Sequence, residues 1–379
     1  MQEQDFSKKQ DFPGTTGNLF DLALHRAIVI QKIPAYIFAL ILFLLAFAID
    51  QTRWALTTGL FAFFCLDWLL ITSLPWANKS YGPSRPTVLI LAVLRSLAAL
   101  FPLFISLPLE GLGTLLVLYG FWIEPHRIRV TRVSFISPKL PAGQSFSVLH
   151  LGDLHLERIT ARERQLSSLI AELKPDLILF SGDFINLSYL RDPQAWREVR
   201  EVIQDWQTPH GAYVVTGSPA VDLDDVMPTL LDGLPIHWLK NDKVTLDING
   251  LPVNLFGLSC SHKPFVDGPQ LKALAANREA NFSILLYHSP DLAPITAQTG
   301  IDLQLSGHTH GGQVRLPLIG ALFTGSLYGK AFEAGRMQLD QLTLYITRGI
   351  GMEGAAAPRV RFLCPPEIIL WKISGPGQS

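Results

Sequence analysis

Two histidines on a glycine-rich turn are the residues of this chain best suited to chemistry. His308 and His310 lie in the segment 305–313, whose sequence is LSGHTHGGQ. The apolar residues 301–305 predict a short buried strand, and the glycines predict a tight turn on which the backbone can approach a ligand closely. Two imidazoles on such a turn suit a metal ion, but an isolated pair is as readily an incidental polar turn. Residues elsewhere in the chain distinguish a metal site from an incidental polar turn.

Polar residues follow other short apolar runs in the same half of the chain. These runs are residues 146–151, 176–180, 212–215 and 282–287. After them come, in order, Asp153 with His155, then Asp183, then Ser218, then His288. Helical patterns lie between the runs. Alternating strands and helices predict an α/β fold whose functional groups lie at strand ends.

The candidate ligands are carboxylates and imidazoles. They are Asp153, His155, Asp183, His288, His308 and His310. This set suits Mn, Fe or Zn, and the absence of thiolates argues against soft metal ions. Six ligands are too many for one tetrahedral zinc, but they suit two divalent ions about 3.5–4 Å apart with a shared carboxylate. Two such ions hold both the attacking and the leaving oxygen of a phosphoryl group and turn bound water into hydroxide near neutral pH.

The order of these motifs resembles the calcineurin-like metallophosphoesterase superfamily. The motifs D-x-H, G-D, a single histidine after a strand, and G-H-x-H follow one another within residues 145–373. The resemblance implies a sandwich of two packed mixed β-sheets flanked by helices. The closing segments RGIG (348–351), PR (358–359) and PPEI (365–368) resemble the branch that carries transmembrane helices ahead of the phosphoesterase domain.

The resemblance also implies a role for each ligand. The first metal ion would be held by Asp153, His155 and His310, the second by His288 and His308, and Asp183 would bridge the two. Metal-hydroxide chemistry would then rest on Asp153, Asp183 and His288. Asn186, which follows the bridging aspartate at a position often polar in this family, is a weaker candidate ligand.

One motif departs from the family. Where the family has Gly-Asn-His after the third strand, this chain has Gly217-Ser218-Pro219. The family's asparagine binds the second metal ion, and its histidine assists the leaving group or stabilises the transition state. Proline cannot act as an acid or donate a hydrogen bond, and general acid catalysis is worth about 10²–10⁴-fold. Substrates with good leaving groups, such as pyrophosphates and aryl esters, would suffer least.

Four residues are candidate replacements. Ser218 would be a weak oxygen ligand. Asp222 would supply a carboxylate ligand, although the local pattern favours a helix N-cap ahead of residues 224–226. His262 and His210 are candidate proton donors, but nothing in the sequence places either near the site. We interpret both as ordinary surface histidines.

The amino-acid composition limits the class of protein, its partners and its compartment. Hydrophobic residues make up 48% and charged residues 17% of the 379 residues, mean hydropathy is +0.27, and most of the apolar excess precedes residue 124. The net charge of −1 gives no reason to expect nucleic acid as a partner. Cys65, Cys260 and Cys364 are too far apart for a disulfide framework or a zinc ribbon. This cysteine usage fits a reducing compartment.

Four apolar runs precede the catalytic half. They are residues 33–49, 54–76, 87–109 and 112–123. A span needs about 20 apolar residues, from roughly 17, so the first three qualify and the shorter fourth crosses or re-enters. We expect four parts. They are a polar tail and juxtamembrane segment (1–32, with 1–18 disordered), a membrane domain of about four helices (33–125), a linker (126–144) and the phosphoesterase domain (145–374).

The distribution of Lys and Arg predicts the orientation of the spans. Basic residues lie in the N-terminal segment, the second loop and the segment after the fourth run, whereas the first loop has only Arg53. This pattern predicts a multi-pass protein of the inner or plasma membrane with its catalytic domain on the cytoplasmic side. Asp67 and Arg95 lie within apolar runs, where they either pair with each other or reach separately toward the interface.

These observations favour a membrane-anchored, dinuclear-metal phosphoesterase. It would cleave phosphodiester or pyrophosphate bonds of a phosphorylated, lipid-linked substrate at the bilayer, and the resemblance suggests a hydrolase of the UDP-2,3-diacylglucosamine type. The main alternative is a catalytically degenerate sensor or scaffold that binds metal, because the Asn-His pair is missing. A transporter that uses Asp67 and Arg95 is a third hypothesis, weakened by the small number of spans.

Overall fold

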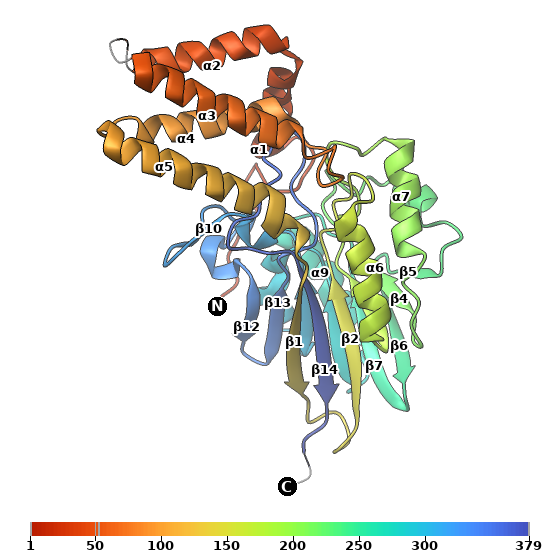
Figure 1. Ribbon diagram of the computed structural model, residues 1–379. Coiled ribbons are helices and arrows are strands. Elements are labelled where there is room, and N and C mark those ends of the chain that lie inside the picture. Colours follow the sequence, from red (N-terminus) through yellow and green to blue (C-terminus); the bar gives the residue numbers. More distant parts are fainter. Residues whose placement is uncertain (1, 50, 52–53, 378–379) are drawn as a thin grey trace.

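The structure is a computed structural model that describes residues 2–49, 51 and 54–377 (Figure 1). Arg53, the basic residue predicted in the first loop, lies outside the described residues. A group of helices near the N-terminus lies against one end of an α/β body in which the strands run side by side (Figure 1).

Two six-stranded mixed sheets form the α/β body. The first has the order β1 (Arg129–Ile136), β14 (Glu367–Ser374), β2 (Ser145–Leu151), β3 (Leu177–Phe180), β4 (Ala212–Val214) and β5 (Ile236–Trp238). The second has the order β12 (Gly335–Leu339), β13 (Leu342–Ile346), β9 (Leu303–Ser306), β8 (Phe282–Leu286), β7 (Leu251–Gly257) and β6 (Asp242–Ile248). A separate ribbon pairs β10 (Arg315–Leu316) with β11 (Gly320–Ala321).

The two sheets pack face to face through a shared apolar core. Val148 and Leu179 from the first sheet belong to the same buried cluster as Val253 and Ile284 from the second. The outer face of the first sheet is covered by α6 (Ala161–Leu173), α7 (Pro193–Ile203) and α8 (Met227–Leu231), and that of the second by α9 (Pro264–Ala275) and α10 (Ala293–Thr296). This arrangement confirms the predicted fold class.

Strand direction determines where the functional residues meet. Strands β2, β3 and β4 are parallel to one another, and so are β7, β8 and β9. Their carboxyl ends lie at the end of the body that faces the helices (Figure 1). Strand β1 pairs in parallel with β14, so the expected linker 126–144 contributes an edge strand to the first sheet.

The helical part consists of α1 (Leu19–Ala27), α2 (Ala35–Ile49), α3 (Trp54–Thr72), α4 (Ser84–Ala98) and α5 (Leu103–Val117). Helix α5 continues through a π-helical turn, so that one helix runs from Leu103 to His126. Among the described residues, two helices, 54–72 and 103–126, are long and apolar enough to cross a membrane. The bent pair formed by residues 19–32 and 35–49 would be a third candidate if it is one span.

The predicted boundaries of the last two apolar runs are wrong. The expected run 87–109 is broken between Ala98 and Leu103, and its second half joins 112–123 in one helix. Pro102 is the residue at which the new helix begins. Because proline has no N–H and disfavours helical backbone in the residue before it, the break falls there despite the continuous apolar composition.

The two charges inside the helical part form an ion pair. Arg95 Nε lies 2.6 Å from Asp67 Oδ2, and Arg95 Nη1 lies 2.8 Å from Glu110 Oε2. All three side chains are buried. Arg95 therefore ties α4 to both α3 and α5, as expected for charges that must be neutralised in an apolar environment. Pairing with Asp67 was one of two alternatives that the sequence left open, and nothing in the sequence indicated Glu110.

The polar N-terminal segment packs on the α/β body, which corrects the expectation of a disordered tail. Phe12 is buried, and its ring centroid lies 6.0 Å from that of Phe265. The backbone N–H of Ala220 donates to the carbonyl of Gly14 at 3.2 Å. An aromatic anchor inside an otherwise polar sequence supplies the burial that a disordered tail lacks.

The helical part is joined to the body by buried polar contacts. Glu157 lies in the loop after β2 of the first sheet. Its carboxylate accepts a hydrogen bond from the backbone N–H of Tyr81 at 2.9 Å and pairs with Arg359 at 2.6 Å. The N–H of Arg361 donates to the carbonyl of Gly120 at 3.0 Å. The connection between the two parts is therefore specific rather than a flexible tether.

Candidate metal centre

All six predicted ligands lie beyond the carboxyl ends of the inner strands, and the fold brings them together. Asp153 and His155 follow β2, Asp183 follows β3, His288 follows β8, and His308 and His310 follow β9. Both sheets thus contribute to one site. Three groups of side chains there have ligand atoms within 4.8 Å of one another: Asp153, His155 and His310; Asp153, Asp183 and His288; and His262, His288 and His308.

The first group consists of buried side chains with unsatisfied polar atoms. His155 Nε2 and His310 Nε2 lie 3.0 Å apart. Within the described part of the chain, Asp153 Oδ2 and the Nδ1 atoms of both histidines have no hydrogen-bond partner. Burial raises the pKa of Asp153 to about 6, although the nearby His288 acts in the opposite direction. A divalent cation would satisfy these atoms.

Asp183 lies at the centre of the site. Its Oδ2 is 3.3 Å from His155 Nε2 and 3.2 Å from His288 Nε2, so the carboxylate links the first group to the second. The N–H of Ser218 donates to Oδ1 at 2.6 Å. Burial by itself favours the protonated acid, but His288 and His155 hold the pKa of Asp183 well below its usual range. Asp183 is thus an ionised carboxylate shared between the two groups.

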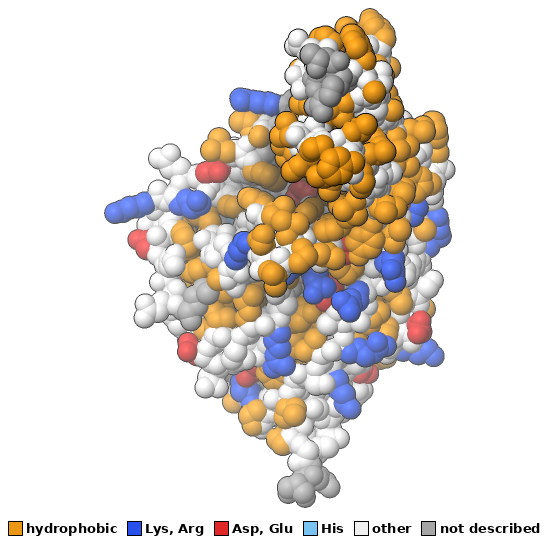
Figure 2. Space-filling model, turned by 60° about the vertical axis from the view of Figure 1, so that its left-hand side comes forward, with side chains coloured by type: hydrophobic (Ala, Val, Ile, Leu, Met, Phe, Trp, Pro, Cys, Tyr) orange, Lys and Arg blue, Asp and Glu red, His pale blue; other side chains and the backbone are white. Residues whose placement is uncertain are grey.

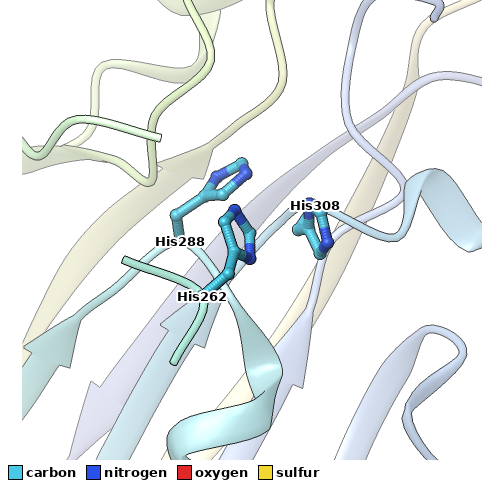
Figure 3. Close-up of side chains that lie close together, drawn as sticks. All are labelled: His262, His288 and His308. Atoms are coloured by element: carbon cyan, nitrogen blue, oxygen red, sulfur yellow. The ribbon is translucent and has the colours of Figure 1, made fainter. Parts of the chain in front are cut away.

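The third group is a set of three imidazoles. The rings of His262, His288 and His308 point toward one another from the loops that follow β7, β8 and β9 (Figure 3). The ring centroid of His262 is 4.2 Å from that of His308 and 5.7 Å from that of His288. Burial, reinforced by His288, lowers the pKa of His308 to about 3. Burial acts likewise on His288, but Asp183 and Asp153 outweigh it and raise its pKa to about 9.

His262 is the functional residue that sequence reasoning missed. It was interpreted as a surface histidine, but it is 2% exposed and lies inside the site. The segment 251–257 before it is another apolar run ending in a polar turn, which is the signal that identified the other ligands. His210 is partly exposed and its Nε2 lies 3.1 Å from Asn249 Oδ1, in agreement with its interpretation as a surface residue.

Most residues of the metal centre have an unusual backbone conformation. Asp153, Asp183 and His262 have φ of 49°, 63° and 59°, and His155, His308 and His310 share this left-handed region. Residues other than glycine adopt it at a cost of about 1–3 kcal/mol each, which the surrounding structure must offset, and such residues cluster at functional sites. The tight turns aim successive side chains into one pocket.

Two of the weaker candidate ligands have other tasks. Asp222 is no helix cap, because its carboxylate accepts hydrogen bonds from the N–H groups of Asp183, Phe184 and Gly217 at 2.7–2.9 Å. Asn186 donates to the carbonyl of Met352 at 3.0 Å. Both side chains therefore hold loops around the site.

Ser218 is the weaker candidate that stays within the site. Its Oγ is 3.1 Å from the Nε2 atoms of both His288 and His262. Gly217 before it lies so close to the Asp183 carboxylate that a Cβ atom would overlap it. Pro219 supplies no polar side-chain group, as expected from the sequence.

A cavity of about 340 Å³ opens over the centre. His155, Asp183 and His308 line it on one side, and residues 9–21 of the N-terminal segment line it on another. Phosphate-sized groups can therefore reach the ligand atoms. A donor set of buried carboxylates and imidazoles, at the ends of two sheets and beneath an accessible cavity, fits two divalent metal ions and defines a metal-dependent hydrolase of phosphoric esters or anhydrides.

Comparison with known proteins gives the family. The chain belongs to the calcineurin-like phosphoesterases: the pattern of that family matches residues 146–312. YkuE of Bacillus subtilis, an uncharacterised metallophosphoesterase, is 31% identical over 266 residues, which are 67% of this chain and 88% of YkuE.

Two further relatives carry the names of enzymes. The phosphodiesterase YaeI of Escherichia coli is 28% identical over 60% of this chain and 82% of its own length. LpxG of Chlamydia trachomatis, a UDP-2,3-diacylglucosamine pyrophosphatase, is 24% identical over 66% of this chain and 90% of its own length. These relatives support phosphoester hydrolysis by this chain.

Proposed function

We propose that this chain is a membrane-bound phosphodiester or pyrophosphate hydrolase that takes a lipid-linked substrate. The observation that carries the proposal is the position of the ribbon β10–β11 between the cavity over the metal centre and an apolar groove. Gln313 and Phe323 line the cavity over the metal centre, whereas their chain neighbours Val314 and Leu322 line the groove. A phosphorylated head group and a hydrocarbon chain of one molecule can thus occupy the two sides of the ribbon.

The groove has the chemistry of a hydrocarbon site. It encloses about 480 Å³ between α4, α5 and the ribbon. Ile90 and Leu94 come from α4, Leu116 from α5, and Leu316 and Leu322 from the ribbon. Nearly all of its accessible surface is apolar, so its burial by an acyl chain would contribute about 25 cal/mol per Å².

An exposed apolar surface continues outward from the groove. Orange side chains cover the helical part, and Lys and Arg side chains lie below them on the body (Figure 2). Leu100, Phe104 and Leu115 are 62–77% exposed on the helices, and the ribbon tip adds Leu318 and Ile319. A surface this apolar supports a membrane contact, and basic residues beside it suit anionic head groups.

The packing of the N-terminal segment bears on membrane topology. Residues 9–21 line the cavity over the metal centre, which supports a topology with both ends of the helical part on one side of the bilayer. Such a topology has an even number of crossings. The basic residues at both ends, among them Lys8, Lys9, Arg127 and Arg129, favour the cytoplasmic side. We therefore propose a multi-pass membrane protein with a cytoplasmic catalytic domain.

The residues of the site would have different roles in the hydrolysis. When bound, the two metal ions would polarise the phosphoryl group and supply a nucleophile from water near neutral pH. Asp153, His155 and His310 would hold one ion, His288 and His308 the other, and Asp183 would touch both. Since Pro219 stands where the family has a histidine that assists the leaving group or stabilises the transition state, a substrate with a good leaving group suits this site best. The phosphate of a nucleotide–lipid pyrophosphate meets this requirement, and we propose a substrate of the UDP-2,3-diacylglucosamine kind.

Two matched variants on α4 test the lipid assignment. Leu94→Trp fills the groove, whereas Leu97→Trp changes a residue of similar exposure, 58% against 56%, that does not line it. Loss of about two buried methylenes, at roughly 0.8 kcal/mol each, predicts about a tenfold loss of kcat/KM. We expect this loss for Leu94→Trp with UDP-2,3-diacylglucosamine in mixed micelles, and unchanged turnover of a water-soluble bis(nitrophenyl) phosphate. Equal activity of both variants on the lipid would contradict the proposal.

A further inference from the structure

The second metal site of this chain is short of one ligand by comparison with the family pattern. Ser218 occupies the position of the metal-binding asparagine. Its hydroxyl is a weak ligand, and it lies 3.1 Å from both His288 Nε2 and His262 Nε2. A stronger donor must come from elsewhere if the second ion is to be held firmly.

His262 is placed where that donor is needed. It follows β7, which pairs in parallel with β8, so its loop leaves the same edge of the sheet as the loop of His288. One ring nitrogen from each of His262, His288 and His308 lies within 4.8 Å of the other two. Figure 3 shows the three rings turned toward a common point.

The surroundings of His262 hold the ring in this position. Gly14 of the N-terminal segment lies so close to the imidazole that a Cβ atom there would overlap it. The Nε2 atom of His262 meets Ser218 Oγ, itself a part of the site. A buried histidine that served only the core would direct its nitrogens to structural partners, whereas this one directs Nε2 to the metal centre.

We infer that His262 is a ligand of the second metal ion and replaces the asparagine of the family. The second site would then have three imidazoles, from His262, His288 and His308, and would share the Asp183 carboxylate with the first. The inference rests on the two-metal chemistry of the family and is independent of the lipid assignment. The exchange of a neutral amide for a neutral imidazole leaves the charge of the site unchanged.

The replacement of the family's asparagine by His262 should change which metal ion the second site prefers. Imidazole ligands suit Zn and Fe, whereas carboxylate, carbonyl and water oxygens suit Mn. The second site, with an additional nitrogen in place of an amide oxygen, should therefore prefer Zn²⁺ to Mn²⁺ more strongly than a site with asparagine. A variant that restores the amide should reverse that preference.

The test is the metal content of the full-length, detergent-purified protein, measured by plasma mass spectrometry after equilibration with Zn²⁺ or with Mn²⁺ alone. We expect two ions per chain for the wild type and about one for His262→Ala. His210→Ala, which removes a partly exposed histidine that contacts Asn249 outside the site, should keep two. Two ions in His262→Ala with unchanged affinity would overturn the inference.

A second variant keeps the test decisive if His262→Ala folds poorly. The double variant Ser218→Asn with His262→Ala moves the ligand back to the family position. We expect it to recover the second ion and to bind Mn²⁺ at least tenfold more tightly relative to Zn²⁺ than the wild type does. If the double variant binds only one ion, or keeps the wild-type preference between Zn²⁺ and Mn²⁺, His262 does not replace the asparagine. Thermal unfolding of each variant shows whether the fold is kept.

Discussion

The Nε2 atoms of His155 and His310 lie 3.0 Å apart in the interior of the protein, and the first of them is 3.3 Å from Asp183 Oδ2. Burial and the neighbouring His155 hold the pKa of His310 well below its usual range, whereas Asp183 outweighs burial and raises the pKa of His155. A proton shared by the two Nε2 atoms would still leave the Nδ1 atoms of both rings and Asp153 Oδ2 without a hydrogen-bond partner among the described residues. The relationship indicates a cation site rather than a structural pair.

Removal of metal should therefore destabilise the folded protein. At a free metal concentration a thousandfold above Kd, binding to the folded state contributes about 4 kcal/mol. We expect the thermal midpoint of chelator-treated protein to rise on addition of Zn²⁺ or Mn²⁺, as followed by calorimetry in detergent. The double variant His155→Ala with His310→Ala should show a much smaller rise. An unchanged midpoint in the wild type would argue against tight metal binding.

Asp222 should be needed for the shape of the site although it holds no metal. Its carboxylate accepts three backbone N–H groups, two of them from Asp183 and Gly217. Asp222→Asn turns one acceptor into a donor that faces another donor, and each buried N–H left unpaired costs about 1–3 kcal/mol. We expect a lower unfolding free energy and weaker metal binding, measured by denaturant unfolding and metal titration.

Asp225→Asn is the matched control for that change. Asp225 pairs with Arg191 at 2.7 Å, but both side chains are more than 60% exposed. Exposed pairs contribute about 0–1 kcal/mol, so this variant should unfold and bind metal as the wild type does. Equal effects of the two substitutions would mean that the hydrogen bonds of Asp222 do not shape the site.

His150 should make the folded protein sensitive to acid. It is a fully buried residue of β2, and burial lowers its pKa to about 3. In the unfolded chain a histidine titrates near 6.5, so between these two values the unfolded state binds the extra proton. Stability from this group is present above about pH 6.5 and is lost as the pH falls, by about 2 kcal/mol between pH 7 and 5.

The variant His150→Gln checks this prediction. The glutamine has no proton to gain, so the metal-saturated variant should lose less stability between pH 7 and 5 than the wild type does, as followed by denaturant unfolding at each pH. The metal ligands are the same in both proteins, which cancels their contribution. Parallel pH profiles would place the acid sensitivity elsewhere.

The ion pair between Glu157 and Arg359 should couple the helical part to the body. Both side chains are buried, and Glu157 also binds the N–H of Tyr81. Removal of one partner leaves a buried charge unpaired and costs about 3–5 kcal/mol, whereas replacement of both is far less damaging. We expect Arg359→Met to destabilise the protein more than the double variant with Glu157→Gln. If the double variant is the less stable, the pair does not act in this way.

Sequence patterns predicted the α/β class and the six strand-end candidates because both rest on local signals, whereas the two-sheet sandwich was predicted from the family resemblance. A short apolar run followed by a polar turn is recognisable without knowledge of its neighbours, as at Asp153 and Asp183. His262 was missed because it lies five residues beyond the end of β7, and only the folded loop returns it to the centre. The N-cap interpretation of Asp222 failed because its three partners come from segments joined by the tertiary fold.

In the helical part, too, local sequence patterns did not predict features that depend on a single residue or on tertiary contacts. Apolar composition is continuous across residues 98–103, so the break before Leu103 depends on the backbone restriction of a single residue, Pro102. The partner Glu110 of Arg95 lies on the helix after that break, and no sequence spacing relates the two. The N-terminal segment looked disordered because its buried aromatic residue, Phe12, packs against Phe265 of α9, which is distant in the sequence.

The central claim is that two metal ions at this centre hydrolyse phosphoric esters. The most direct test titrates metal-free, detergent-purified protein with Mn²⁺ or Zn²⁺ and follows bound metal and hydrolysis of bis(nitrophenyl) phosphate in the same samples. The account predicts that turnover appears as the second equivalent binds and that Asp183→Asn, which alters the shared carboxylate, abolishes it. Protein that binds two ions without any turnover would contradict the claim and leave a metal-binding membrane sensor as the function.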